Sequence, residues 1–222
     1  MDDNAGTSDI SSFKVVLLGE GAVGKSSVLL RYIENKFNNK HLSTTQASFA
    51  TRKLNIDGKD VELNIWDTAG QEKYHSLGPI YYRGSQGAIL VYDITDERSF
   101  ERSPAANPIK NWVRELQEVL KGSAALFVVG NKIDLEGTRT ISKETALQYA
   151  ESVNANYHEC SAKENINIDS LFDNIAKVML EREKDAATNL TRRSSLRRSN
   201  SRRTLQVIDD DEAAARPRKK CC

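Results

Sequence analysis

Three nearly continuous apolar runs divide the first 130 residues of the chain. They are Lys14 to Leu18, Ala88 to Tyr92 and Ala124 to Val129. Runs of this length without alternating polar positions are typical of strands that are buried on both faces of a parallel sheet. We therefore predict three central strands at these positions.

A different pattern precedes the second run. Val61, Leu63 and Ile65 alternate with polar residues, and Asp57-Gly58 lies just upstream between two strand-like segments. Alternation of this kind indicates a strand with one wetter face, and Asp-Gly favours a tight turn. The pattern predicts a β-hairpin.

Helical spacing of apolar residues alternates with the strands. It is clearest over residues 109–120 and 168–179, and a third helix is expected after Ser142, which is a good N-cap. We interpret these apolar stripes as core packing. Strands and helices that take turns along a chain predict an α/β layer fold with a mainly parallel sheet.

Composition changes this picture little, but the cysteines and the charges add to it. No stretch approaches the roughly 20 apolar residues that span a bilayer, and residues 1–12 are polar and acidic, so we expect neither membrane spanning nor secretion. Two of the three cysteines are the last two residues, which argues against a disulfide scaffold and favours a reducing compartment.

The positive charge is concentrated after Leu180. Residues 181–222 carry 12 Lys and Arg against 7 Asp and Glu, whereas the rest of the chain has a net charge of −4. A low-complexity tract of Arg and Ser between 192 and 203 cannot bury enough apolar surface to order itself. We predict a flexible tail from about residue 183, and an anionic partner would meet this tail.

A glycine-rich motif follows the first strand and precedes a helical run. Its residues are Gly19, Glu20, Gly21, Ala22, Val23, Gly24, Lys25 and Ser26, and Ser27 completes the predicted nucleotide-binding set. Glycines let successive backbone N–H groups face phosphate oxygens, the lysine reaches the outer phosphates, and the serine hydroxyl suits Mg²⁺. A mere glycine turn is the alternative, and the strand and helix on either side argue against it.

Three further motifs lie at the ends of predicted strands. Asp67, in the segment Trp66 to Glu72, can approach a magnesium ion, although an Asp-Thr-Ala-Gly turn alone is weak evidence. Asn131, Lys132 and Asp134 follow the third buried run, and Ser161, Ala162 and Lys163 follow a short strand.

The second of these motifs predicts which base binds. The carboxylate of Asp134 can accept two hydrogens from the ring N–H and the amine of guanine, and adenine offers no such pair. Leaving a buried carboxylate unpaired costs several kcal/mol by order of magnitude, so guanine is favoured over adenine. A backbone N–H of the turn that Ser161, Ala162 and Lys163 form is expected to face the guanine carbonyl.

Together these motifs resemble the Ras superfamily, and the segment Trp66 to Glu72 with the terminal Cys221-Cys222 resembles the Rab family, in particular an endosomal subgroup. The resemblance covers residues 13–182. It implies a P-loop NTPase fold: a mostly parallel six-stranded sheet with one antiparallel edge strand and helices on both faces. It also divides the chain into an N-terminal extension (1–12), a GTPase domain (13–182) and a disordered tail (183–222).

The resemblance assigns roles at the matching positions. Thr44 is expected to bind Mg²⁺ and the γ-phosphate, although Thr45, where relatives carry Ile or Leu, leaves open which hydroxyl coordinates. The metal site would be Ser26, Thr44 and Asp67, with Asp67 acting through water. Gly70 would donate its N–H to the γ-phosphate, Gln71 would orient the attacking water, and Phe37 would pack on the guanine ring.

Three aromatic residues match positions that Rab effectors contact. They are Phe49, Trp66 and Tyr81. Aromatic residues there also suit a core, and the sequence leaves the two interpretations equally open.

The resemblance implies a switch that binds GTP or GDP with Mg²⁺ and hydrolyses GTP slowly, with Gln71, Lys25 and Thr44 as catalytic residues. The expected partners are an exchange factor, a GTPase-activating protein, a GDP-dissociation inhibitor, a Rab escort protein with geranylgeranyl transferase, and GTP-dependent effectors. The expected location is the cytoplasmic face of endomembranes, in particular early endosomes, with a cytosolic pool bound to the GDP-dissociation inhibitor.

Cys221 and Cys222 resemble a double-geranylgeranylation signal, because two lipids beside basic residues anchor a chain stably. A terminal disulfide or a metal clip is the alternative. The Arg and Ser tract suits lipid attraction, a nucleic-acid contact or a spacer, and we favour a spacer with lipid attraction and phosphorylation at Ser195. Residues 103–108, with two prolines, predict a surface loop inserted relative to the family.

Three other functions remain to be weighed. A GTP-binding scaffold without useful turnover is opposed by Gln71 and Thr44. A nucleic-acid binder is opposed by the acidic balance of the domain and the absence of aromatic residues within the arginine tract. An ATPase is opposed by Asp134.

Overall fold

The computed structural model describes residues 10–39, 44, 47–68, 78–100 and 108–200, the last twelve of these by their backbone alone. Contacts divide the chain between Glu183 and Lys184 into two units, each of which is considered by itself. Within the described residues no helix is long and apolar enough to cross a bilayer.

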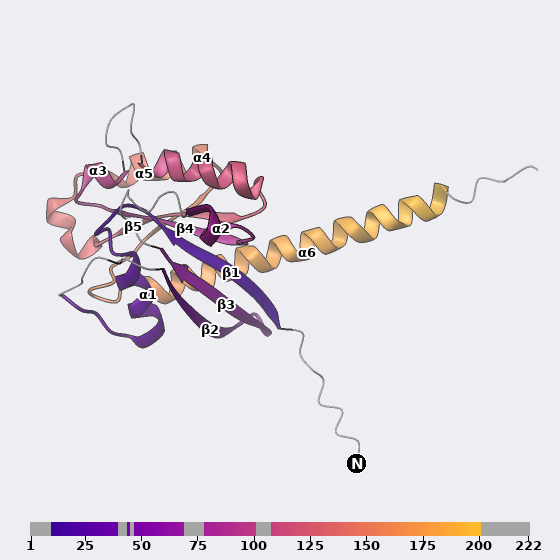
Figure 1. The fold of residues 1–222 in the computed structure, drawn as a ribbon, viewed down its shortest axis with the longest axis horizontal. Helices are drawn as coiled ribbons and strands as arrows, with labels where there is room; N and C mark the ends of the chain where they lie inside the picture. Colours follow the sequence, from indigo (N-terminus) through magenta and orange to yellow (C-terminus); the bar gives the residue numbers. More distant parts are fainter. Residues whose placement is uncertain (1–9, 40–43, 45–46, 69–77, 101–107, 201–222) are drawn as a thin grey trace, which may run out of the picture. The chain divides into compact units, whose positions relative to one another are not determined.

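A six-stranded sheet with the order β2-β3-β1-β4-β5-β6 forms the centre of the first unit. Figure 1 shows the strands side by side. The strands are β1 (Ser11–Leu18), β2 (Ser48–Ile56), β3 (Lys59–Asp67), β4 (Gly87–Asp93), β5 (Ala125–Asn131) and β6 (Asn156–Glu159). Every pairing is parallel except β2 with β3, so the predicted sheet with one antiparallel edge strand is confirmed.

The antiparallel pair is the predicted hairpin. Asp57 and Gly58 connect its strands with φ angles of 51° and 84°, and Ile56 pairs with Lys59. Positive φ at both central residues is the geometry of a type I′ turn, which matches the twist of the flanking strands and favours Asp-Gly. Inward residues of β3 such as Val61, Leu63 and Ile65 are fully buried.

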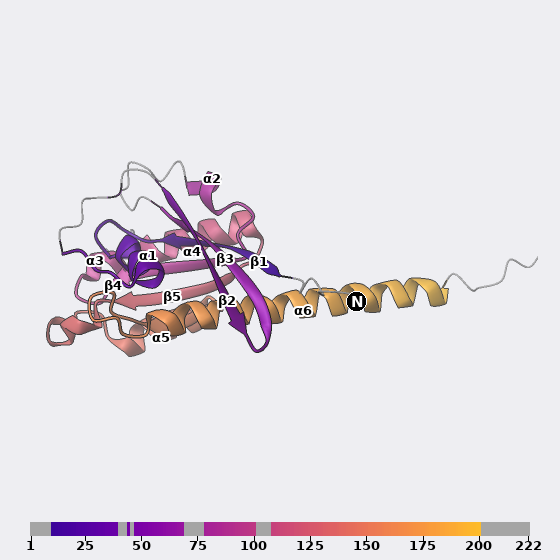
Figure 2. The same cartoon turned by 90° about the horizontal axis from the view of Figure 1, so that it is seen from below.

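Helices cover both faces of the sheet, as the upper and lower layers of Figure 1 and the turned view of Figure 2 show. One core cluster joins the sheet to α1 (Lys25–Glu34) and to the first part of α6 (Ile168–Asn200). The other joins it to α2 (Gly78–Tyr82), α3 (Glu97–Phe100), α4 (Pro108–Leu120) and α5 (Lys143–Ser152). Successive residues of β4 and β5 enter opposite clusters, which explains why these strands lack charged and amide side chains before their last residues, Asp93 and Asn131.

The predicted helices are present with local reasons for their ends. Ser142 is the N-cap of α5, where its hydroxyl accepts the N–H of Thr145 at 3.1 Å. Pro108 is the first residue of α4, a position where its missing N–H costs nothing. Most of the predicted insertion, namely residues 103–107, lies outside the described residues.

The backbone of α6 is helical to Asn200, whereas the sequence analysis predicts a flexible tail from residue 183. Residues 184–200 contain neither Gly nor Pro and include helix formers such as Ala186, Ala187 and Leu190. Local propensity therefore permits a helix even where no apolar stripe exists. The side chain of Ser195 and residues 201–222, with Cys221 and Cys222, lie outside what the structure describes.

Candidate functional site

The predicted motifs meet at one edge of the sheet. Parallel pairing places Leu17 of β1 beside Asp67 of β3, and Asp93 of β4 beside Asn131 of β5. Gly130 pairs with Glu159, two residues before Ser161. Because carboxyl ends of parallel strands share one edge, the loops that follow them form a single site.

Backbone geometry explains the two outer glycines of the phosphate loop. Gly19 has a φ of +139°, and a Cβ there would lie 2.2 Å from the carbonyl oxygen of Val91. Gly24 has a φ of +97°, and a Cβ there would lie 2.4 Å from Nδ2 of Asn131. Neither position tolerates a side chain, so the loop closely approaches both β4 and the Asn131 amide.

Between these glycines the loop exposes its small residues and buries one apolar side chain. Gly21 and Ala22 are exposed, and Ala22 has a φ of 63°. Val23 is 1% exposed and belongs to the core, so it contributes to the site through its backbone. Glu20 precedes Gly21 within the loop. Ser27 follows the loop and lies in the first turn of α1.

Lys25 turns back over the loop that precedes it. Its Nζ donates to the carbonyl oxygens of Gly19 and Glu20, both at 2.8 Å, and only 5% of the residue is exposed. Burial lowers the pKa of Lys25 to about 8, while the nearby carboxylates of Asp67 and Glu20 act in the opposite direction. A buried ammonium in this position would be stabilised by an anion in the loop.

Three oxygen-bearing side chains converge beside the loop. Ser26 Oγ lies 2.8 Å from Thr44 Oγ1, and it donates a hydrogen bond to the carboxylate of Asp67. Asp67 is 1% exposed. Hydroxyl and carboxylate oxygens are the hard donors that Mg²⁺ prefers, so this set fits the predicted metal. Thr45, Gly70 and Gln71 lie outside the described residues.

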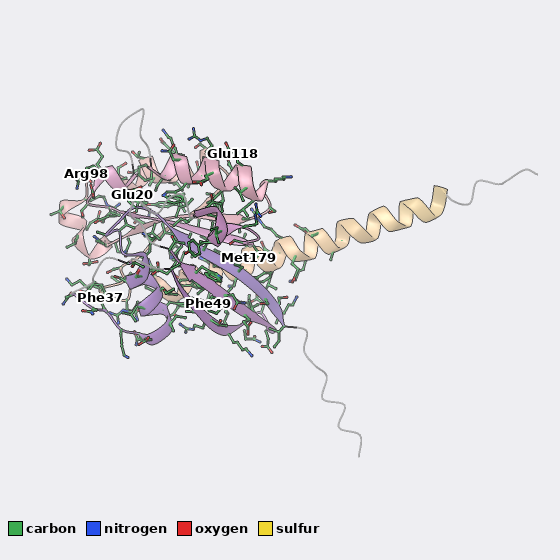
Figure 3. All side chains as sticks on the ribbon, viewed as in Figure 1. Glu20, Phe37, Phe49, Arg98, Glu118 and Met179 are labelled. Atoms are coloured by element: carbon green, nitrogen blue, oxygen red, sulfur yellow. The ribbon has the colours of Figure 1, made fainter. Side chains whose placement is uncertain are left out.

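A pocket of about 360 Å³, large enough for a purine base, lies next to the phosphate loop. Its lining includes Gly24, Phe37, Asn131, Asp134, Ala162 and Lys163. Phe37 also packs against the core cluster, and Figure 3 labels it at the end of the domain that carries α1. The pocket therefore brings together residues predicted to bind the base from three separate loops, although Ser161 is not among its lining residues.

The Asp134 carboxylate is held in place on one side. Ser161 Oγ donates to its Oδ1 at 2.6 Å, and Lys163 Nζ lies 3.8 Å from Oδ2. The Asp134 side chain is 8% exposed. A buried carboxylate fixed through one oxygen presents the rest of its acceptor capacity to the pocket, which suits a ligand with paired N–H donors.

Asn131 joins the phosphate loop to the turn formed by Ser161, Ala162 and Lys163, here called the base-binding turn. Its Nδ2 donates to the carbonyl of Val23 at 2.9 Å, and its Oδ1 accepts the N–H of Ala162 at 3.2 Å. The sequence analysis predicts that a backbone N–H of this turn faces the guanine carbonyl. In the structure the N–H of Ala162 donates to Asn131 instead, so a guanine carbonyl would have to share this donor or use another.

Two side chains of the site are not predicted by any sequence motif. Arg31 of α1 donates to the carbonyls of Ala162 and Lys163, and nothing in its helical context signals this. Asp93 binds Lys132 Nζ at 2.5 Å and is 6% exposed. Asp93 is a carboxylate at the end of a buried strand, as Asp67 is, and this position could have identified it from the sequence.

The three aromatic residues form a row on the hairpin side of the domain. The rings of Phe49 and Trp66 are 5.1 Å apart and those of Trp66 and Tyr81 are 6.3 Å apart. Phe49, labelled on β2 in Figure 3, is 54% exposed, and Ile80, which precedes Tyr81 in the chain, is 71% exposed. Of the three, Phe49 is exposed, whereas Trp66 and Tyr81 are half-buried and Trp66 also packs against the second core cluster.

Comparison with known proteins now settles the family. The model of the Ras family matches residues 14–181, which include every motif of the site. The chain belongs to the Ras family. It is therefore a small GTPase of the P-loop fold, and the resemblance noted from its motifs is confirmed.

Curated relatives place this Ras-family chain beside one group of Rab proteins. It is 54% identical to "Ras-related protein Rab-21" of Homo sapiens over 214 residues, covering 95% of this chain and 91% of the relative. It is 58% identical over 168 residues to Rab-21 of Geodia cydonium, covering 76% of this chain and 71% of the relative. Rab-21 of Dictyostelium discoideum is 46% identical over 202 residues, covering 91% of this chain and 92% of the relative.

Proposed function

We propose that the chain is a magnesium-dependent switch that binds and hydrolyses GTP and regulates endosomal membrane traffic. The observation that carries this proposal is the meeting of the phosphate loop, the Ser26, Thr44 and Asp67 cluster and the Asp134 pocket at one sheet edge. Each of the three suits a different part of a guanine nucleotide. Membership of the Ras family supports the same conclusion.

Phosphate binding would rely on the loop and on Lys25. The backbone from Gly19 to Gly24 curls before the N-terminus of α1, and N–H groups at a helix N-terminus favour anions. Lys25, now bonded to two loop carbonyls, would exchange one or both for oxygens of the outer phosphates. A phosphate anion would also raise the lowered pKa of its ammonium.

Ser26, Thr44 and Asp67 would hold Mg²⁺, with Asp67 acting through water. When bound, the ion would neutralise charge on the outer phosphates during transfer. The protein's own contribution is to keep the three oxygens together: Ser26 starts a helix, Asp67 ends a strand, and Thr44 belongs to the segment between α1 and β2.

Hydrolysis would proceed by attack of water on the γ-phosphate, with the γ-phosphorus to bridging-oxygen bond breaking and GDP leaving. Gln71 would orient the water, Gly70 would donate its N–H to the γ-phosphate, and Lys25 would offset the developing charge. A GTPase-activating partner is expected to raise turnover by roughly 10³ to 10⁵-fold, the range seen in other members of this superfamily.

The switch output would be read by protein partners at the aromatic row of Phe49, Trp66 and Tyr81. The exposure of Phe49 and Ile80 supports docking at this face. We expect an exchange factor, an activating protein, a GDP-dissociation inhibitor and the escort and prenylation machinery as the other partners. Attachment through Cys221 and Cys222, with early endosomes as the destination, completes the proposal.

Nucleotide competition tests this proposal. Purified protein with Mg²⁺ and a fluorescent guanine nucleotide is titrated with GTP, GDP and ATP, and phosphate release is then followed. We expect tight binding of GTP and GDP, weak binding of ATP and slow release. Equal competition by GTP and ATP would overturn the assignment of Asp134, and GTP binding without phosphate release would favour the scaffold alternative.

A further inference from the structure

Arg31 occupies an unusual position in the site, since it binds two separate segments at once. It lies in the last turn of α1 and is half-buried. Its Nε donates to the carbonyl of Ala162 at 2.8 Å, and its Nη2 donates to the carbonyl of Lys163 at 2.9 Å. Its Nη1 donates to the carbonyl and the side-chain oxygen of Asn35 at 2.8 and 3.2 Å.

All four acceptors are carbonyl or amide oxygens. A guanidinium that binds neutral oxygens in this way gains little from charge pairing, and its planar fork of donors fixes the directions of the acceptors. Hydrogen bonds with one charged partner are stronger than neutral ones. Arg31 therefore acts as a rigid connection between α1 and the turn at Ala162 and Lys163.

The two connected segments both border the base pocket. Ala162 and Lys163 line it, and so does Phe37, two residues after Asn35. Asn165 adds a second link, because its Nδ2 donates to Asn35 Oδ1 at 3.2 Å. The contacts of Arg31 therefore lie outside the pocket and join two of the segments that border it.

We propose that Arg31 is a positioning residue that slows nucleotide release by holding the base-binding turn against the end of α1. Arg31 does not line the base pocket, so it acts through Ala162, Lys163 and Asn35. This inference rests on the proposed guanine-nucleotide function and deepens it, because it names what keeps the base enclosed.

The geometry predicts a graded response to substitution. Arg31→Gln keeps one amide donor pair on a shorter side chain, so it loses the contacts with the turn. Arg31→Lys keeps the charge, but a single ammonium cannot reach three carbonyls that lie around a planar fork. We expect GDP release to be about tenfold faster for Arg31→Gln and about threefold faster for Arg31→Lys.

The experiment measures dissociation of a fluorescent GDP analogue from the full chain with Mg²⁺ and excess unlabelled GDP. Arg114→Gln is the matched control, because Arg114 is exposed on α4 and contacts Asn111 alone among its described hydrogen bonds. Wild-type release rates for Arg114→Gln and the graded increase at Arg31 would support the proposal. A wild-type rate for Arg31→Gln would overturn it.

A second readout separates positioning from a general loss of structure. The affinities for GDP and ADP are compared by competition, and the fraction of active sites is measured from the binding amplitude. Loosening the base-binding turn lowers GDP affinity, leaves ADP affinity unchanged and preserves the active fraction. Equal losses for GDP and ADP would overturn the positioning role. If the wild-type chain itself failed to prefer GDP over ADP, the proposed function would fail instead.

Discussion

The phosphate end and the base end of the site are held together in different ways. At the phosphate end Lys25 binds carbonyls that lie six and five residues before it in the chain. At the base end Asn131 binds Val23 across 108 residues, and Arg31 binds Ala162 across 131 residues. The phosphate loop is therefore organised largely within one motif, whereas the base pocket exists only through contacts between distant segments.

Substitution of Asp134 should break the base end most severely. Asp134→Ala removes the buried acceptor, and we expect GTP and GDP affinity to fall about 10³-fold, because sites built to hydrogen-bond a polar group depend strongly on that contact. Nucleotide competition measures the change. ATP affinity is the internal control, since it should stay the same, and unchanged GTP affinity would contradict the role of Asp134.

Gln71→Leu should affect the chemistry at the phosphate end and leave binding intact. Gln71 lies outside the described residues, so this expectation comes from the family pattern. We expect normal GTP binding and hydrolysis that is about a hundredfold slower, because the attacking water loses its orientation. A single-turnover assay gives the rate, and wild-type turnover would exclude the role assigned to Gln71.

Ser26→Asn should distinguish the two nucleotides. The larger amide cannot keep the contacts of Ser26 Oγ with Thr44 and Asp67, so we expect GTP binding to weaken about tenfold more than GDP binding. Titrations with and without Mg²⁺ measure this difference, which should disappear when the metal is removed. Equal losses for both nucleotides in the presence of Mg²⁺ would count against Ser26 as a metal ligand.

Asp93→Asn tests whether a single long-range contact matters at the base end, because it removes only the contact with Lys132. The amide can keep the bonds of Oδ1 with Thr95 but loses the ion pair with Lys132. We expect GDP release about threefold faster. Asp96→Asn, which removes an exposed ion pair with Arg98, is the control. An Asp93→Asn effect that persists in a Lys132→Met background would show that Asp93 does not act through Lys132.

The buried thiol of Cys160, next to the base-binding turn, should make the free energy of unfolding depend on pH. Burial raises the pKa of this thiol from an ordinary value of 9.0 to about 12. Between these values the unfolded chain loses the proton and the folded chain keeps it, so stability should fall as pH rises above 9. The contribution is roughly 1 kcal/mol per pH unit in this range. Urea unfolding at pH 8 to 10 measures it, and Cys160→Ala should lose less stability.

The same contrast explains how much the sequence predicts. The strands, the Asp57-Gly58 hairpin and the Ser142 cap follow from neighbouring residues, and the structure confirms them. The order Gly19 to Ser26 likewise contains the chemistry of a phosphate loop in consecutive positions. Local patterns of this kind are readable because the interacting groups are close in the chain.

Arg31 and Asp93 could not be assigned in the same way. Their side chains reach partners on other elements, and the direction of a side chain depends on the packing of α1 and β4 rather than on the residues around them. The helix through residues 184–200 was not predicted for a related reason: apolar periodicity is the signal for a helix, and this segment has none.

The base pocket can form only after all of the distant segments that build it have been synthesised. The β2 and β3 hairpin closes over a two-residue turn and can form as soon as it is synthesised. Asn131 needs both Val23 and Ala162, and Arg31 needs Lys163, so the pocket is incomplete until more than 160 residues have left the ribosome. Domains dominated by such distant contacts fold slowly. Guanine nucleotide can therefore stabilise the pocket only after the chain has been synthesised as far as Lys163.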